Sequence, residues 1–170
     1  MLSEKMAKAI NEQINKEFFS AYLYLEMANY YADESLDGFR NWFTVQAKEE
    51  VAHGMIFVNY LLDHSCKVEL EAIDKPGKVY NDYKEPLDGS LAHEKEITAS
   101  INKLYKLADE ENDYRTRQIL DWFVREQYEE EVSAQDLIDR YEIFGEDKHA
   151  LWEMNQDLAG RTYVEPTINE

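Results

Sequence analysis

Residues 36–64 read LDGFRNWFTVQAKEEVAHGMIFVNYLLDH, and this stretch decides the fold class. Its apolar residues recur at alternating spacings of three and four, which is the pattern of a helix with one buried face. The positions on that face are Phe39, Phe43, Gln46, Glu50, His53, Phe57 and Tyr60. The stretch therefore predicts a long α-helix whose buried face carries polar side chains at its centre.

The same spacing recurs in three other parts of the chain. It predicts helices over about residues 4–33, 90–111 and 114–144. Ser3 and Ser35 stand before the first two helices and are the expected N-caps. Short polar turns join the first helix to the second and the third to the fourth, so each of these two pairs should be antiparallel.

The connection between the second and third helices is much longer. Helical spacing lapses from about residue 65 to residue 87, where the segments KPGKV and EPLDGS supply proline and glycine breakers. A chain of roughly 22 residues can extend to some 70 Å, which exceeds the ~43 Å length of a 29-residue helix. The connection can therefore return along the whole bundle. This predicts an all-α, up-down-down-up four-helix bundle with a long crossover.

The C-terminal part is expected to add one short element. After Gly145, the residues Leu151, Met154 and Leu158 share one face, which predicts a fifth helix over about residues 147–158 and a tail at 159–170. The length of 170 residues fits a single domain spanning residues 1–170, with the bundle at about 4–144.

Composition limits the partners and the compartment. The 36 acidic and 18 basic side chains give a net charge of −18, which disfavours nucleic acid and anionic membranes and favours cations. The single cysteine, Cys66, excludes an internal disulfide framework, so we expect a reducing, cytoplasmic location. No stretch is apolar over the roughly 18 residues that a membrane helix needs.

Polar residues interrupt the apolar face of every long helix. Glu17 lies in the first row, Glu94 in the third, and Gln127 with Glu130 in the fourth. No lysine or arginine stands in these rows, and buried carboxylates without a countercharge repel one another. The simplest countercharge is a pair of metal ions, bound by single carboxylates from two helices and by pairs three residues apart from the other two. Glu94 lies before the centre of its predicted helix, so that helix begins earlier or the crossover is asymmetric.

These residues resemble the motifs of bacterial non-haem ferritins, in the ferritin-like di-iron superfamily. The resemblance spans essentially the whole chain and rests on Glu17, Tyr24, the segment EEVAH at 49–53, Glu94, and EQYEEE at 126–131. It implies a ferritin-like bundle in a hollow homo-oligomeric cage of 24 subunits. It also implies a ferroxidase centre in each subunit, which oxidises Fe(II) with O₂ or H₂O₂, and a stored ferric mineral.

The resemblance also implies a role for each residue of the di-iron centre. Glu17, Glu50 and His53 would hold one iron, with Glu50 bridging to the second. Glu94 and Glu130 would hold that second iron. Gln127 would orient bound oxygen or water. Tyr24 could donate a hydrogen bond to a ligand or supply an electron, and a core tyrosine with a satisfied hydroxyl is an equal alternative.

The resemblance extends to a third iron site and argues against haem. Glu49, Glu126 and Glu129 match that site, and each precedes a core position by one residue, or about 100° of helical rotation. A solvated acidic strip is the alternative for these three residues. Haem-binding bacterioferritins have methionine after the bridging glutamate, where this chain has Val51, so we expect no haem.

Two other functions stay open at this point. A di-iron redox enzyme of peroxidase or oxygenase type would use the same bundle without storing iron, because a fold alone does not define a function. A metal-free helical interaction protein would leave the four polar interruptions unexplained. The number of irons bound per chain separates storage from catalysis, and failure to bind Fe(II) or Zn(II) would favour the interaction protein.

Overall fold

The computed structural model describes residues 2–168, in which the chain forms five helices and no strand. The predicted all-α fold class is therefore confirmed. The helices are α1 (Glu4–Asp33), α2 (Asp37–Asp63), α3 (Glu85–Glu110), α4 (Tyr114–Phe144) and α5 (Lys148–Leu158). Among the helices of this described part, none is long and apolar enough to cross a membrane.

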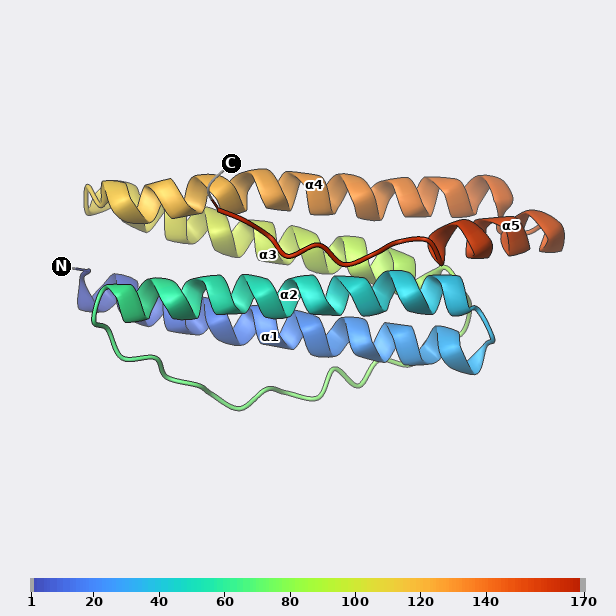
Figure 1. Cartoon of the computed structure of the whole chain (residues 1–170), viewed down its shortest axis with the longest axis horizontal. Coiled ribbons are helices and arrows are strands. Elements are labelled where there is room, and N and C mark those ends of the chain that lie inside the picture. Colours follow the sequence, from blue (N-terminus) through green and yellow to red (C-terminus); the bar gives the residue numbers. More distant parts are fainter. Residues whose placement is uncertain (1, 169–170) are drawn as a thin grey trace.

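The first four helices form an elongated bundle (Figure 1). α1 and α4 point in one direction, α2 and α3 point in the other, and the crossover between α2 and α3 runs along the bundle. This is the predicted up-down-down-up topology. α1 packs against α2 and α3, and α3 packs against α4. In α2 and α4, which are described in full, no Cα atom of one helix lies within 8 Å of a Cα atom of the other, so this side of the bundle is wider.

The helix starts follow local capping chemistry, with one correction to the sequence prediction. The Ser3 hydroxyl accepts a hydrogen bond from the backbone N–H of Met6 at 3.0 Å, so the expected cap of α1 is present. Ser35 is not the N-cap of α2. Its φ of 61° places it in the left-handed region, and its own N–H donates to the carbonyl of Ala32 in the turn that ends α1. Leu36 occupies the cap position without a side-chain hydrogen bond.

The third helix begins at Glu85 rather than at residue 90, which corrects the predicted start. The proline and glycine of EPLDGS favour a break in the helix, but a proline also fits the first turn of a helix, where its missing N–H costs no hydrogen bond. Pro86 occupies that first turn, and the carboxylate of Asp82 accepts the N–H groups of Lys84 and Glu85. The earlier start brings Glu94 closer to the middle of its helix, so the first of the two explanations for its position is correct.

A polar layer divides the core into two apolar halves. One half contains Tyr24, Tyr31, Phe39 and Phe43, whose rings pack near the junction of α1 and α2. The other half lies toward the opposite end of the bundle and includes the stacked pair Phe57 and Phe123. The buried polar side chains between them include Gln13, Glu17, Gln46, Glu50, His53, Glu94, Gln127 and Glu130. The packed aromatic halves hold these polar groups away from water.

The short helix α5 packs against its own bundle. Met154 and Leu158 are buried in the core half near the start of α2. The side-chain oxygen of Asn155 accepts the N–H of Gly38 at 2.8 Å, and a Cβ atom on Gly38 would lie 1.6 Å from the backbone oxygen of Asn155. Gly38 is therefore required for this close approach, and α5 fixes the point from which the C-terminal tail leaves.

Candidate metal centre

The polar layer draws side chains from all four long helices. Its buried carboxylates are Glu17 from α1, Glu50 from α2, Glu94 from α3 and Glu130 from α4, and the buried imidazole of His53 from α2 lies beside them. Each interrupts an apolar row, and helical geometry points residues three or four positions apart to the same face. The four interruptions that the sequence displays therefore meet inside one bundle.

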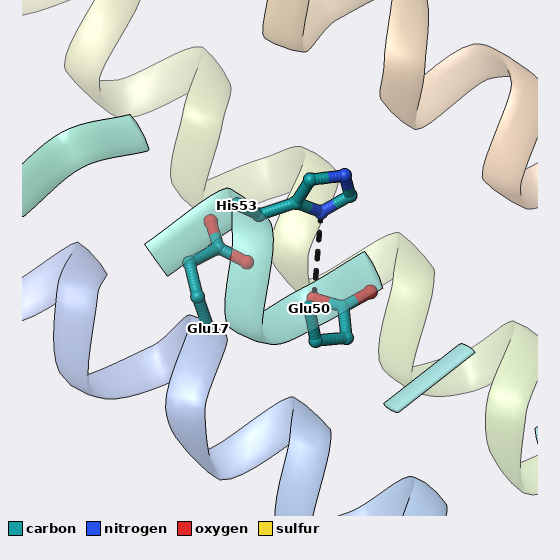
Figure 2. A group of neighbouring side chains, drawn as sticks. All are labelled: Glu17, Glu50 and His53. Atoms are coloured by element: carbon teal, nitrogen blue, oxygen red, sulfur yellow. Dashed lines mark ion pairs between the residues drawn. The ribbon is translucent and has the colours of Figure 1, made fainter. Parts of the chain in front are cut away.

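Glu17, Glu50 and His53 form one group of potential ligands (Figure 2). One ligand atom from each lies within 4.8 Å of the others. His53 Nδ1 is 3.7 Å from Glu50 Oε2, and the carboxylate of Glu17 approaches them from the neighbouring helix. This group coincides with the first set of iron ligands that the family resemblance implies.

A second group of potential ligands contains His53, Glu126 and Glu130. His53 Nε2 lies 3.6 Å from Glu126 Oε1, so the imidazole stands between two carboxylates. The resemblance pairs Glu94 with Glu130 instead. Neither of the two groups found in the described residues contains Glu94.

The Glu94 carboxylate is held by two hydrogen-bond donors. The Tyr24 hydroxyl donates to its Oε1 atom, and the Gln127 amide donates to its Oε2 atom at 3.1 Å. The hydroxyl of Tyr24 is thus satisfied by a candidate ligand, so donation to a ligand and a satisfied core hydroxyl are the same contact. Gln127 acts here on a carboxylate, and its expected contact with oxygen or water stays a prediction.

The Glu17 carboxylate receives a chain of hydrogen bonds that the sequence did not reveal. Lys16 Nζ donates to Ser100 Oγ at 2.6 Å, Ser100 donates to Gln13 Oε1 at 2.6 Å, and Gln13 Nε2 donates to Glu17 Oε1 at 2.8 Å. Each of these three hydrogen bonds is donated in the direction of Glu17. Such partners orient a ligand and favour its anionic form. Gln13 precedes Glu17 by one helical turn, which is the only sequence signal for it.

The pKa values reflect burial in a layer of like charges. Burial raises the pKa of Glu17, Glu50 and Glu94, and it raises the pKa of Glu130 to about 8 with help from the nearby charge of Glu94. Burial opposes protonation of His53, but the carboxylates of Glu126 and Glu50 outweigh it and raise the pKa of His53 well above its usual value. Without a metal, the layer therefore favours protonated groups.

The buried donors fit a metal ion. Glu17 Oε2 and His53 Nε2 are buried and have no hydrogen-bond partner among the described residues. Unpaired buried polar atoms are costly, and a cation that used these lone pairs would remove that cost. Carboxylate oxygens with one imidazole nitrogen suit iron, and thiolates, which would favour zinc, are missing from both groups of described ligands.

Of the three carboxylates expected at a third site, the structure groups only Glu126 with other potential ligands in the described residues. Glu126 approaches His53, Glu129 is exposed, and Glu49 forms an ion pair with Arg161 at 2.6 Å. Within the described residues, neither group of potential ligands includes Glu49 or Glu129. Sequence reasoning missed Arg161, because the tail has no periodicity that would reveal where it packs.

Comparison with known proteins agrees with this geometry. A family model described as a ferritin-like domain matches residues 7–144, which is the four-helix bundle without the first three residues of α1. The chain belongs to the ferritin family. Over 165 residues, it is 37% identical to a bacterial non-haem ferritin of Staphylococcus aureus (strain USA300), covering 97% of this chain and 99% of that protein. A bacterial non-haem ferritin of Staphylococcus epidermidis is 38% identical over 165 residues, which again cover 97% of this chain and 99% of that protein.

Solved ferritin structures are also similar to this chain. An Archaeoglobus fulgidus ferritin engineered into a closed form superimposes with a TM-score of 0.94 at 37% identity, covering 96% of this chain and all of that one. The open-pore ferritin of the same organism gives a TM-score of 0.93 at 38% identity. The ferritin-like bundle and the family resemblance are therefore confirmed.

Proposed function

We propose that this chain is the subunit of an iron-storage ferritin. It would oxidise Fe(II) to Fe(III) at the buried centre, with O₂ or H₂O₂ as oxidant, and deposit a ferric mineral in the cavity of a cage. One observation carries the proposal: buried carboxylates from all four helices and one imidazole converge, and no lysine or arginine in the described part of the chain makes a direct contact with Glu17, Glu50 or Glu94. Family membership supports iron as the cargo.

In this proposal, the centre brings two ferrous substrates to one oxidant. Glu17, Glu50 and His53 would bind one iron, Glu94 and Glu130 would bind the other, and Glu50 would bridge them. Two adjacent irons each give up one electron, so that O₂ is reduced to H₂O₂, or H₂O₂ to water, without a free radical. The negative charge of the ligands favours Fe(III) over Fe(II), which drives the oxidation.

The surrounding side chains would position these ligands. Tyr24 and Gln127 fix the two oxygens of Glu94, and Gln13 holds one oxygen of Glu17, leaving the other free for metal. The aromatic rings of Trp122 and Phe123 pack edge-on against His53 and exclude water from that side. The chain thus supplies a rigid donor set in a dry space, which is the condition for rapid two-electron chemistry.

The storage proposal includes assembly and a third iron. We propose a homo-oligomer of 24 subunits without haem, in which the whole chain acts as one domain. Tyr22, Leu25, Val51 and Met55 are exposed apolar side chains on α1 and α2, which neighbouring subunits would cover. Glu49, Glu126 and Glu129 would bind the third iron with help from Glu130.

Particle mass measured together with aerobic Fe(II) uptake tests the proposal. We expect a cage that takes up far more iron than two ions per chain. Uptake that stops at about two irons per chain would favour a non-storage di-iron enzyme. A 20.1 kDa monomer that binds neither Fe(II) nor Zn(II) would contradict both of these functions.

A further inference from the structure

The C-terminal tail covers the wide side of the bundle. After α5, the chain turns back and runs between α2 and α4 (Figure 1). The Asn41 side chain holds the start of this segment, since its amide donates to the backbone oxygens of Leu158, Ala159 and Arg161 at 3.2, 3.3 and 2.9 Å. The backbone of Arg161 is therefore anchored on α2, and its side chain reaches the bundle from a fixed point.

The Arg161 guanidinium contacts three groups of α2. Nη2 donates to Glu49 Oε2 at 2.6 Å, and Nη1 donates to Gln46 Oε1 at 2.9 Å and to the backbone oxygen of Trp42 at 3.2 Å. The guanidinium carbon also lies 4.5 Å from the ring centre of Trp42. A planar guanidinium gains from all of these contacts at once, so one orientation is strongly favoured.

Gln46 extends the influence of Arg161 into the buried centre. Its amide has one accepting and one donating end. Because Oε1 accepts from Arg161, the NH₂ group is turned toward Glu130, where Nε2 donates to Oε2. Arg161 thus contacts Glu49 directly and Glu130 through one side chain. These are two of the carboxylates proposed for the third iron.

We propose that Arg161 is the resident cation of the third site and competes with the third metal ion for Glu49. This inference rests on the proposed third site. A metal at Glu49 Oε2 would need the lone pairs that accept from Arg161, and at either oxygen the metal and the guanidinium would be two positive charges on one carboxylate, which repel each other. The guanidinium stabilises the acidic edge when the third metal is absent and makes that metal bind more weakly than the inner two.

Displacement of the guanidinium has a structural consequence. The contacts of Arg161 with Glu49 and Gln46 are side-chain links between the tail and α2, beside the backbone links from Asn41. When a metal takes Glu49, its contact with Arg161 breaks and the tail loses part of its anchorage. Binding of the third metal therefore loosens residues 159–168, whereas binding of the first two does not.

Titration of the assembled protein with Zn(II), which has no redox chemistry, tests the proposal by calorimetry. Arg161→Gln should raise the affinity of the third zinc about five- to tenfold and leave the two tight sites unchanged. Arg140→Gln is the matched control: it removes the same charge from a residue that pairs with Asp157 of α5 at 2.7 Å. The control should leave all zinc affinities unchanged.

Hydrogen exchange on the unmodified protein gives a readout that needs no variant. Exchange in residues 159–168 should accelerate when zinc exceeds two equivalents per chain and should stay constant below that ratio. Equal third-site affinity in the wild type and Arg161→Gln, or a tail that never responds to zinc, would overturn the role of Arg161. Failure of both the wild type and Arg161→Gln to bind a third zinc would also overturn it, but this result would not contradict the two-iron centre. Loss of the two tight sites would instead contradict the proposed function.

Discussion

Glu49 and Glu50 are neighbours in the sequence, but they belong to two different regions of the molecule. The Glu50 side chain is 2% exposed and faces Glu94 and Glu17, and burial raises its pKa well above the usual value. The Glu49 side chain is 19% exposed and binds Arg161. Burial raises its pKa as well, but the guanidinium opposes that shift.

The contrast shows what makes a buried carboxylate available to a metal. About 100° of helical rotation separates the two side chains, so Glu50 faces the dry core, where no described lysine or arginine contacts it, and Glu49 faces the tail, where Arg161 does. The inner region is left with excess negative charge that only protons or metal can neutralise. At Glu49, the chain itself already supplies a countercharge, the guanidinium of Arg161. Residue type is the same in both, and the countercharge differs.

The largest expected effect comes from removing the inner carboxylate. Glu50→Ala should lower the initial rate of aerobic Fe(II) oxidation by about 100-fold or more. Loss of a side chain that only hydrogen-bonds to a metal ligand already lowers metal affinity or activity by about 10–100-fold. Glu49→Ala is the matched control and should change this rate by less than about threefold. Stopped-flow absorbance measures both rates, and light scattering checks assembly. Equal losses in the two variants would contradict the contrast between the regions.

The inner region should also make the metal-free protein less stable as the pH rises. The pKa of Glu130 is about 8 in the folded chain, against 4.5 for the ordinary group. A carboxyl group with a raised pKa favours folding while protonated, and this contribution is lost as the pH rises from 4.5 through about 8. We expect the unfolding temperature at pH 8 to be roughly 5 °C lower than at pH 5.5, measured by calorimetry.

Two comparisons make this pH dependence specific. Glu130→Gln stays neutral at every pH, so the variant should show a smaller decrease between pH 5.5 and pH 8. Adding Zn(II) to the wild type should raise the unfolding temperature most at pH 8, where the carboxylates are ionised. A metal-free wild type whose stability increases over this range would show that the inner carboxylates are not strained by their charge.

A smaller effect is expected from the hydrogen-bond chain that supports Glu17. Gln13→Leu keeps a similar volume but removes the donor to Glu17, so we expect the affinity for the first Zn(II) to fall by about tenfold. Gln135→Leu removes an amide that contacts Asp139 on the exposed face of α4 and should leave the affinity unchanged. Isothermal titration measures both. Equal affinities in the wild type and Gln13→Leu would show that the hydrogen bond from Gln13 does not help Glu17 to bind metal.

The smallest effect should come from the outer carboxylates. Replacing Glu49, Glu126 and Glu129 together by glutamine should keep the fold and the two tight zinc sites, and change the initial oxidation rate by less than about threefold. The variant should lose the third metal and alter the number of irons oxidised per oxidant consumed. Two results together would favour a solvated acidic strip. The variant would oxidise as many irons per oxidant as the wild type, and iron-soaked crystals would contain no third metal near Glu129.

Much of the fold and of the inner site could be predicted from single residues. Apolar spacing gave the four long helices, and a carboxylate in each apolar row marked the centre, because such a residue is costly to bury without a cation. The start of α3 and the cap of α2 were wrong. Pro86 is both a breaker and a good first-turn residue, and Ser35 is both a good cap and a turn residue, so only the packed chain distinguishes these uses.

The sequence by itself determined the helices, their topology and the excess of buried negative charge, because these depend on periodicity and residue type along one chain. Only the tertiary structure decided which donors hold each carboxylate. Ser100 reaches Gln13 and Arg161 reaches Glu49 across separations of 87 and 112 residues. Contacts of this range depend on how helices and tail pack in space, and no local spacing encodes them. The tertiary fold therefore set the difference between a carboxylate left open to metal and one already bound to arginine.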